Sequence, residues 1–192
     1  MNNQSNSIED EFKIIISVGD ESGIGPEIIL KALFSKEIPH NLDFIIVGSK
    51  NNLENTFKNL KSLGVKNIVD PNNYQIHDIK IPFEINKPKK SNGNASFLYL
   101  KKAIELVQKY TNAALVTGPI CKKSWSLAGH NYSGQTELLA ESCQVRDVGM
   151  LFTAKSPITG WRFNTLLATT HIPLCEVPKQ LSTQLIHTKL DL

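Results

Sequence analysis

The segment Ala113-Ala-Leu-Val-Thr-Gly-Pro119 decides how this chain folds. Its short apolar run stops at Thr-Gly-Pro, which is how a buried strand ends in a loop at the edge of a sheet. The stretch that follows, up to Glu137, carries a lysine, a histidine, a glutamine, hydroxyl groups and a glutamate. Polar groups collected after a buried strand are typical of a ligand site in an open α/β sheet, although an ordinary solvent-exposed connection has a similar composition.

Apolar runs alternate with amphipathic stretches on both sides of this segment. We expect strands at 12–18, 42–47, 113–116, 149–153 and 163–169, and helices at 28–34, about 50–63, 95–110, 136–143 and 177–190. The basic cluster Lys87–Lys90 is expected to be a solvated loop, because Pro88 and Ser91–Asn94 are turn formers. Alternating strands and helices predict an α/β protein with a mainly parallel sheet flanked by helices.

Composition narrows the class of protein. At 192 residues and 41% hydrophobic, the chain can bury a core, while its net charge is only +3. Arg146 and Arg162 are its only arginines, which argues against nucleic-acid recognition. Three widely spaced cysteines show no metal-ligand pattern or disulfide framework, as expected in a cytoplasmic protein. No apolar run is long enough to span a membrane, and the polar residues 1–12 are expected to be disordered.

A glycine loop, Gly19–Gly25, follows the first expected strand with the spacing G-x-x-x-G-x-G. This spacing matches neither the dinucleotide fingerprint nor the P-loop. Its glycines would let the backbone approach an anion at the start of the helix near Pro26, as in those motifs. A purely structural tight turn explains the spacing equally well.

Individual polar residues offer few complete catalytic arrangements. Lys122 could meet a phosphate or carboxylate as a point charge, and two neighbouring lysines could lower the pKa of Cys121. His171 follows the last expected strand, where a lone histidine is more often part of a hydrogen-bonded structure than a metal ligand. No nucleophile and base can be paired, so we assign no catalytic residue.

Five motifs occur in the order and spacing of one enzyme family: Gly19-Asp-x-x-Gly-Ile-Gly-Pro-Glu27, Thr117-Gly-Pro-x-x-Lys122, Ala128-Gly129, Gly134-x-Thr-Glu137 and Ala168-Thr-Thr-His-x-Pro173. From about Ile14 onward, the chain resembles the 4-hydroxythreonine-4-phosphate dehydrogenase (PdxA) family. The resemblance implies the fold of the isocitrate and isopropylmalate dehydrogenases. It also implies NAD- or NADP-dependent oxidation, with decarboxylation, of 4-phosphohydroxy-L-threonine in vitamin B6 (pyridoxal phosphate) biosynthesis.

The resemblance also assigns roles to particular residues. The family holds a divalent metal (Zn, Mg or Co) with three histidines drawn from both subunits of a homodimer, and His171 matches the first of them. Thr136 matches a substrate-binding threonine, and Gln135 stands where the family has a substrate-binding histidine. Glu21-Ser22 replaces the usual Pro-Ala of the first loop, where a carboxylate would disfavour a nearby phosphate.

Members of this family are well over half again as long as this chain. We therefore expect residues 13–192 to form the N-terminal portion of such an enzyme, with the second half of the fold missing and catalysis incomplete. A non-catalytic paralogue that binds a phosphorylated ligand is an alternative. A phosphate acyltransferase of related fold is a third, but Ala168-Thr-Thr-His171 argues against it.

Overall fold

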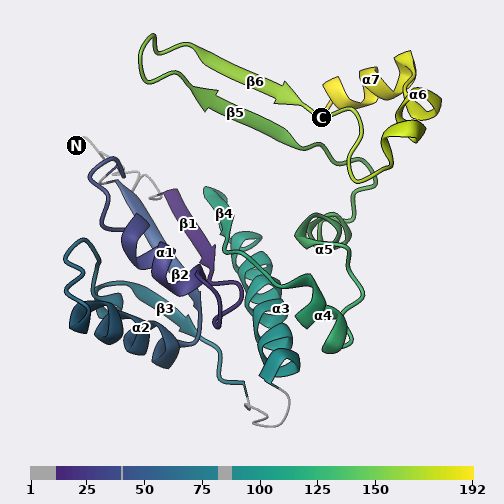
Figure 1. Cartoon of the computed structure of the whole chain (residues 1–192). Helices are drawn as coiled ribbons and strands as arrows, with labels where there is room; N and C mark the ends of the chain where they lie inside the picture. Colours follow the sequence, from purple (N-terminus) through teal and green to yellow (C-terminus); the bar gives the residue numbers. More distant parts are fainter. Residues whose placement is uncertain (1–11, 40, 82–87) are drawn as a thin grey trace, which may run out of the picture. The chain divides into compact units, whose positions relative to one another are not determined.

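The computed structural model describes residues 12–39, 41–81 and 88–192 (Figure 1). The chain forms two compact units, one extending to Ser133 and the other from Gly134 to Leu192. The sequence predicted disorder for residues 1–12. Of these, residues 1–11 lie outside the described residues, and Phe12 begins the first strand. Within the described ranges, no helix is long and apolar enough to cross a membrane.

The first unit is built on a four-stranded parallel sheet. Its strands are β1 (Phe12–Ser17), β2 (Leu42–Gly48), β3 (Gln75–Asp78) and β4 (Ala113–Thr117), in the order β3-β2-β1-β4. The β-branched runs of β1 and β2 are buried in their carboxyl-terminal halves, as expected for strands covered on both faces. The expected α/β fold with a mainly parallel sheet is confirmed.

Three helices connect these strands: α1 (Gly25–Ala32), α2 (Lys50–Ser62) and α3 (Pro88–Val107). α1 packs against α2, whereas α3 packs against β1, β2 and β4. The β–α–β crossovers are right-handed. From β1 to β3 the chain moves toward one edge of the sheet, and after β3 it crosses back to β4 at the other edge. As a result, α1 and α2 cover one face and α3 covers the other. The core between these layers includes Ile15, Leu30, Ile45, Ile46, Leu53, Tyr99 and Leu100, all at most 2% exposed.

The start of α3 differs from the expectation of a solvated loop over Lys87–Lys90. Lys87 lies outside the described residues, but the helix already begins at Pro88, a residue well suited to the first helical turn. Ser91 and Asn92 are buried in the helix rather than exposed in a turn. The preference of these residues for turns is overridden by packing against α4 (Lys122–Leu127), a short helix that the sequence did not predict.

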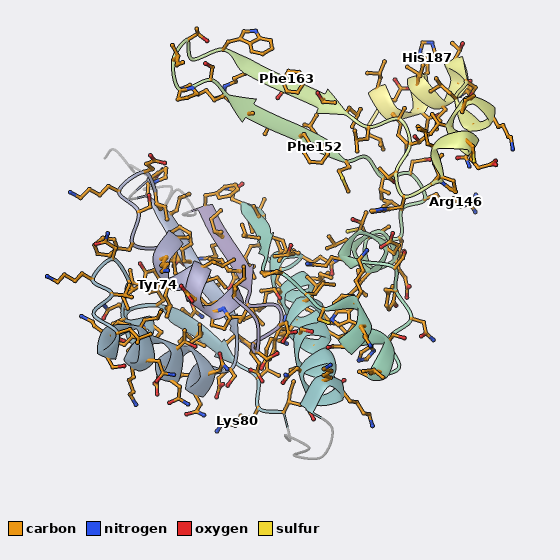
Figure 2. The ribbon with its side chains drawn as sticks, in the orientation of Figure 1. Tyr74, Lys80, Arg146, Phe152, Phe163 and His187 are labelled. Atoms are coloured by element: carbon orange, nitrogen blue, oxygen red, sulfur yellow. The ribbon has the colours of Figure 1, made fainter. Side chains whose placement is uncertain are left out.

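The second unit begins with α5 (Gln135–Ser142) and continues into an antiparallel ribbon of β5 (Leu151–Lys155) and β6 (Arg162–Leu166). The sequence predicted two strands here, at 149–153 and 163–169, and the structure confirms both and pairs them. Phe152 pairs with Thr165, and Ala154 with Phe163, so these four side chains share one face of the ribbon. Figure 2 shows the two labelled phenylalanines on this ribbon.

The predicted helix at 177–190 is interrupted in the structure. α6 (Val177–Gln180) ends before Leu181, and α7 (Thr183–Leu190) begins after Ser182. The hydroxyl of Ser182 accepts a hydrogen bond of 3.1 Å from the N–H of Leu185. Serine competes for backbone donors in this way, which favours a helix start over a helix interior. The prediction of a single long helix at 177–190 is therefore wrong.

Candidate functional site

The carboxyl ends of β1 and β4 meet where the strand order reverses, the usual ligand crevice of an open sheet. In this protein, backbone hydrogen bonds join the segment at the end of β1 to the segment at the end of β4. The N–H of Asp20 donates to Pro119 O at 2.8 Å, and that of Gly118 donates to Ser17 O at 2.7 Å. A Cβ on Gly19 would lie 2.4 Å from Pro119 O. The glycines thus let two backbones pack closely, which favours the structural interpretation of the loop.

The carboxylate of Glu21 is held within this first unit. Tyr99 Oη donates to Glu21 Oε2 at 2.8 Å, and Asn52 Nδ2 donates to the Glu21 carbonyl at 3.2 Å. Burial raises the pKa of the Glu21 carboxyl group, although the Tyr99 hydrogen bond opposes the rise. Glu21 therefore ties the glycine loop to α2 and α3.

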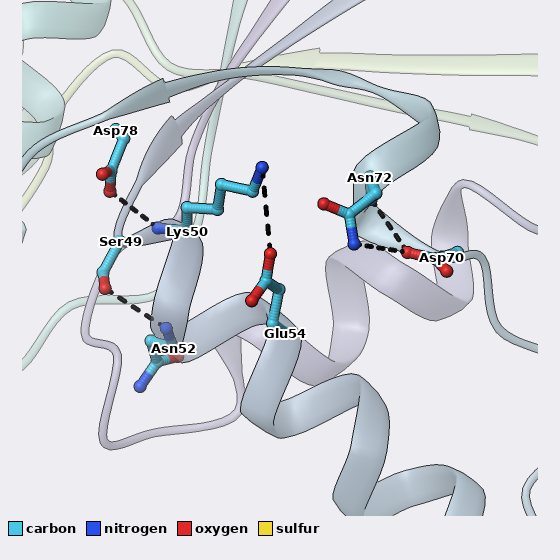
Figure 3. A network of polar contacts seen from close by, with 7 residues as sticks. All are labelled: Ser49, Lys50, Asn52, Glu54, Asp70, Asn72 and Asp78. Atoms are coloured by element: carbon cyan, nitrogen blue, oxygen red, sulfur yellow. Dashed lines mark hydrogen bonds and ion pairs between the residues drawn. The ribbon is translucent and has the colours of Figure 1, made fainter.

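The N-terminus of α2, which follows β2, has its first donors satisfied by side chains (Figure 3). Ser49 Oγ accepts from the N–H of Asn52 at 3.2 Å, and Asp78 Oδ1 accepts from the N–H of Lys50 at 2.9 Å. Free N–H groups at a helix start are what makes it an anion site. These two groups are already engaged, so this helix start is a structural junction between β2 and β3.

The loop between β4 and α5 contains Lys122 and Cys121, both candidates from the sequence. Lys122 is the first residue of α4 and is exposed. Hydrogen bonds from Ser124 lower the pKa of the Cys121 thiol, whereas the sequence had suggested the neighbouring lysines as the cause.

His130, which follows α4, is packed into an aromatic cluster. Its ring stacks on Phe97 with centroids 3.6 Å apart and an interplanar angle of 8°, and its Nε2 lies 3.0 Å from Asn94 Oδ1. Burial lowers the pKa of His130, and the nearby Lys101 acts in the same direction. These contacts give His130 a role in fixing the loop on α3.

A cavity of about 540 Å³ lies entirely within the second unit and brings predicted site residues together. Thr136, from the first turn of α5, and His171, from the segment after β6, both line it. Thr169 and Thr170 add hydroxyl groups beside His171. A volume of this size suits a small ligand. Gln135, at the start of α5, is not among the described residues that line the cavity.

His171 has an unusual backbone conformation. Its φ is 57°, in the left-handed region that few residues other than glycine adopt, and it lies five residues after the end of β6. Such strained positions cluster at functional sites because the surrounding structure must hold them in place. The side chain is exposed at the cavity.

Three charged side chains also line the cavity: Arg146 (labelled in Figure 2), Lys189 of α7 and Glu137 of α5. Lys189 Nζ is positioned by a 2.6 Å hydrogen bond to the Val148 carbonyl. Glu137 Oε2 is inaccessible to solvent and has no hydrogen-bond partner. Leaving a buried acceptor unsatisfied costs about 1–3 kcal/mol. Sequence reasoning missed the two cations, which belong to no motif, although Glu137 stood in Gly134-x-Thr-Glu137.

The described residues do not complete a metal site by themselves. Catalytic zinc sites use three protein ligands. Nowhere in 12–39, 41–81 or 88–192 do three or more histidine, cysteine, aspartate or glutamate side chains gather in a group able to hold a metal ion. His171 is thus a single potential ligand at the cavity.

Comparisons with known proteins show relatives over most of the chain. The sequence model of the family described as pyridoxal phosphate biosynthetic protein PdxA matches residues 40–192. A 4-hydroxythreonine-4-phosphate dehydrogenase of Nostoc sp. is 45% identical over 187 residues, covering 94% of this chain and 52% of the relative. A candidate D-threonate 4-phosphate dehydrogenase of Fusobacterium nucleatum is 33% identical over 156 residues, covering 73% of this chain and 46% of that protein.

The fold is similar to solved structures as well. The crystal structure of a 4-hydroxythreonine-4-phosphate dehydrogenase from Klebsiella pneumoniae gives a TM-score of 0.73 at 26% identity, covering 96% of this chain and 58% of that one. The chain spans about half the length of the curated relatives it matches. The family match covers well over half of the sequence, and the chain belongs to the PdxA family of pyridoxal phosphate biosynthetic proteins.

Proposed function

We propose that this chain provides substrate-binding groups of a 4-hydroxythreonine-4-phosphate dehydrogenase in vitamin B6 biosynthesis. The proposed reaction is NAD- or NADP-dependent oxidation, with decarboxylation, of 4-phosphohydroxy-L-threonine. The observation that carries the proposal is the cavity in which Thr136 and His171 meet, because the family motifs single out both residues independently of the structure. The names of the relatives support the same reaction.

The residues of the cavity supply binding and orientation. The hydroxyl of Thr136 can donate and accept hydrogen bonds, and the His171 ring offers a nitrogen to the substrate hydroxyl or to a metal ion. Arg146 and Lys189 provide positive charge for the phosphate and carboxylate of the substrate. Separately from this cavity, we propose Lys122, exposed at the start of α4, as a point charge for a phosphate or carboxylate.

The proposal includes a divalent metal and a nicotinamide cofactor that the described residues do not hold alone. His171 is one ligand, so a complete metal site requires ligands from outside the described residues. The glycine loop is filled by its own backbone, since a Cβ on Gly25 would lie 2.2 Å from Val18 O. It therefore offers no open cradle for a pyrophosphate. We propose residues 13–192 as the N-terminal portion of the fold, incomplete as a catalyst.

A homodimer in the cytoplasm is the proposed state of the protein. Support for a partner comes from the β5–β6 ribbon, because a two-stranded ribbon alone is marginally stable in water. Phe152 is 55% exposed and Phe163 is 49% exposed on its shared apolar face. Burying these rings against a second copy would remove a large apolar surface from water.

Calorimetric titration of the 192-residue chain with 4-phosphohydroxy-L-threonine tests this function. We expect binding that Thr136→Val and His171→Ala each weaken at least tenfold. His187→Ala is the matched control, because His187 lies exposed on α7 and does not line the cavity. Absence of binding, or equal binding by all four proteins, would contradict the proposal.

The same samples distinguish an incomplete enzyme from a non-catalytic paralogue. NAD⁺ or NADP⁺ is added together with Mg²⁺, Zn²⁺ or Co²⁺, and the reduction of the added nucleotide to NAD(P)H is followed. We expect these metals to tighten substrate binding through His171 with little turnover. Binding that is indifferent to metal and to His171→Ala favours the non-catalytic paralogue, and robust turnover would show that the chain is catalytically complete.

A further inference from the structure

β4 is an edge strand of the parallel sheet, and its two faces differ in how they are covered (Figure 1). Successive side chains of a strand point to opposite faces. Leu115 packs against the core on the face that α3 covers, whereas Val116, on the face of α1, is 47% exposed. Strands of a parallel sheet are normally buried on both faces. On the α1 face, β4 therefore has room for a further covering element.

An apolar groove of about 280 Å³ runs along this uncovered face, within the first unit. Ile14 and Ile16 of β1 line it, and Ile16 is paired in register with Val116 of β4. Ile28 of α1, which is 41% exposed, lines its other side. Among the described residues that line the groove, Thr117 alone has a polar side chain. Contiguous apolar surface of this kind marks an interaction site.

The two edges of the sheet differ in composition. β3, at one edge, has the sequence Gln75-Ile-His-Asp78, with polar residues exposed at both ends. β4, at the other edge, has the sequence Ala113-Ala-Leu-Val-Thr117, without a charge or a proline. Natural proteins protect exposed edges with charges, prolines or covering elements, because an unprotected edge pairs with another strand. The β4 edge is therefore suited to strand addition, and the β3 edge is not.

We propose that the β4 edge and the groove beside it bind a polypeptide equivalent to the half of the relatives that this chain does not match. In this complex one strand pairs with β4, and the apolar face of one helix lies in the groove. Only 52% of the Nostoc relative is covered by this chain, so about half of that protein is available as the occupant. A strand followed by a covering helix is also how the first unit is built. This inference rests on the proposed function, because it names the surface at which the rest of the fold joins residues 13–192.

Co-expression of the tagged 192-residue chain with the unmatched half of the Nostoc relative tests this surface. We expect an equimolar complex that forms without substrate, metal or nucleotide. Val116→Lys and Ile28→Lys should each reduce the recovered complex at least about tenfold, since burying an unpaired charge is unfavourable. Gln75→Lys, exposed on the opposite edge strand, is the matched control and should keep the full complex.

Hydrogen exchange gives a second measurement that does not depend on substitutions. Amides of β4 should exchange more slowly in the complex than in the chain alone, because an added strand accepts their hydrogen bonds. Amides of β3, at the opposite edge, should exchange as before. Thermal unfolding of each variant verifies that the substituted chains remain folded.

The outcomes separate this inference from the proposed function. Failure to form the complex, or equal losses in Val116→Lys and Gln75→Lys, would overturn the inference. Self-association of the chain alone that Val116→Lys abolishes would also overturn it, because a second copy then occupies the edge. Val116 does not line the second-unit cavity, so Val116→Lys should bind 4-phosphohydroxy-L-threonine as the unmodified chain does. A chain that binds this substrate but not the other half leaves the proposed function standing, whereas a complex without substrate binding supports the docking surface alone.

Discussion

Gly93 lies in α3 where this helix meets the backbone of α4. A Cβ at this position would lie 2.0 Å from Ser124 O and 2.9 Å from Trp125 N. Alanine normally favours a helix over glycine by about 1 kcal/mol. Here we expect Gly93→Ala to lower the free energy of unfolding by about 2–3 kcal/mol, because the two helices must move apart.

Urea unfolding of the variant and the unmodified chain measures this change. Gly23→Ala is the matched control, since its Cβ would meet its nearest atom, Asp20 O, at an ordinary 3.4 Å. The control should change stability by less than about 1 kcal/mol. Equal losses in the two variants would mean that the close approach at Gly93 is not what limits substitution.

His130 makes stability depend on pH. Burial lowers the pKa of its ring below the ordinary value of 6.5, so the unfolded chain binds a proton more readily than the folded chain. The stability that depends on a neutral His130 ring is fully present above pH 6.5 and is lost as the pH falls toward the folded-state pKa of this ring. We expect the free energy of unfolding to decrease with acidification over this window.

Urea unfolding between about pH 4.5 and 8 measures this dependence. His130→Phe keeps an aromatic ring against Phe97 but cannot be protonated, so the difference from the unmodified chain isolates the histidine. A His130→Phe profile that follows the unmodified chain would contradict the assignment.

At the scale of elements, the start of α7 depends on one hydroxyl group. Ser182 Oγ accepts from the N–H of Leu185, and α7 carries Lys189 to the cavity. Ser182→Ala should destabilise the helix by about 1 kcal/mol, because the N–H loses its acceptor. Hydrogen exchange of the α7 amides measures this loss, with Thr183→Ala as the control at the next position. Unchanged protection in Ser182→Ala would rule out the cap.

The elements also show what local sequence patterns can and cannot predict. β1, β2 and β4 were predictable because short buried apolar runs have few alternative structures. β3 was not among the expected strands, because Gln75-Ile-His-Asp78 is mostly polar and only partly buried. The early start of α3 was not, since Ser91 and Asn92 favour turns until α4 packs beside them. At the site, motifs indicated Thr136 and His171, and the cavity joins them. Arg146 and Lys189 belong to no motif, and tertiary structure brings their side chains to the same cavity.

For the molecule as a whole, the two units differ in how much apolar surface they bury. Nearly all fully buried hydrophobic side chains of the described residues lie in the first unit, and Leu138 is the one in the second. Burial of apolar surface is the main source of stability. The second unit, which contains the cavity, is therefore held together less strongly than the parallel sheet.

We expect this difference to appear in hydrogen exchange, with amides of β5, β6 and α7 exchanging faster than those of β1, β2 and β4. A ligand that binds only the folded cavity should slow exchange in the second unit selectively. At a concentration of 100 times its Kd, the free energy of opening measured by exchange should rise by about 2.7 kcal/mol. His171→Ala should reduce this protection to about 1.4 kcal/mol or less at the same concentration of 4-phosphohydroxy-L-threonine, whereas His187→Ala should keep it. Protection spread equally over both units would place the ligand elsewhere, because a cavity formed by one unit stabilises that unit first.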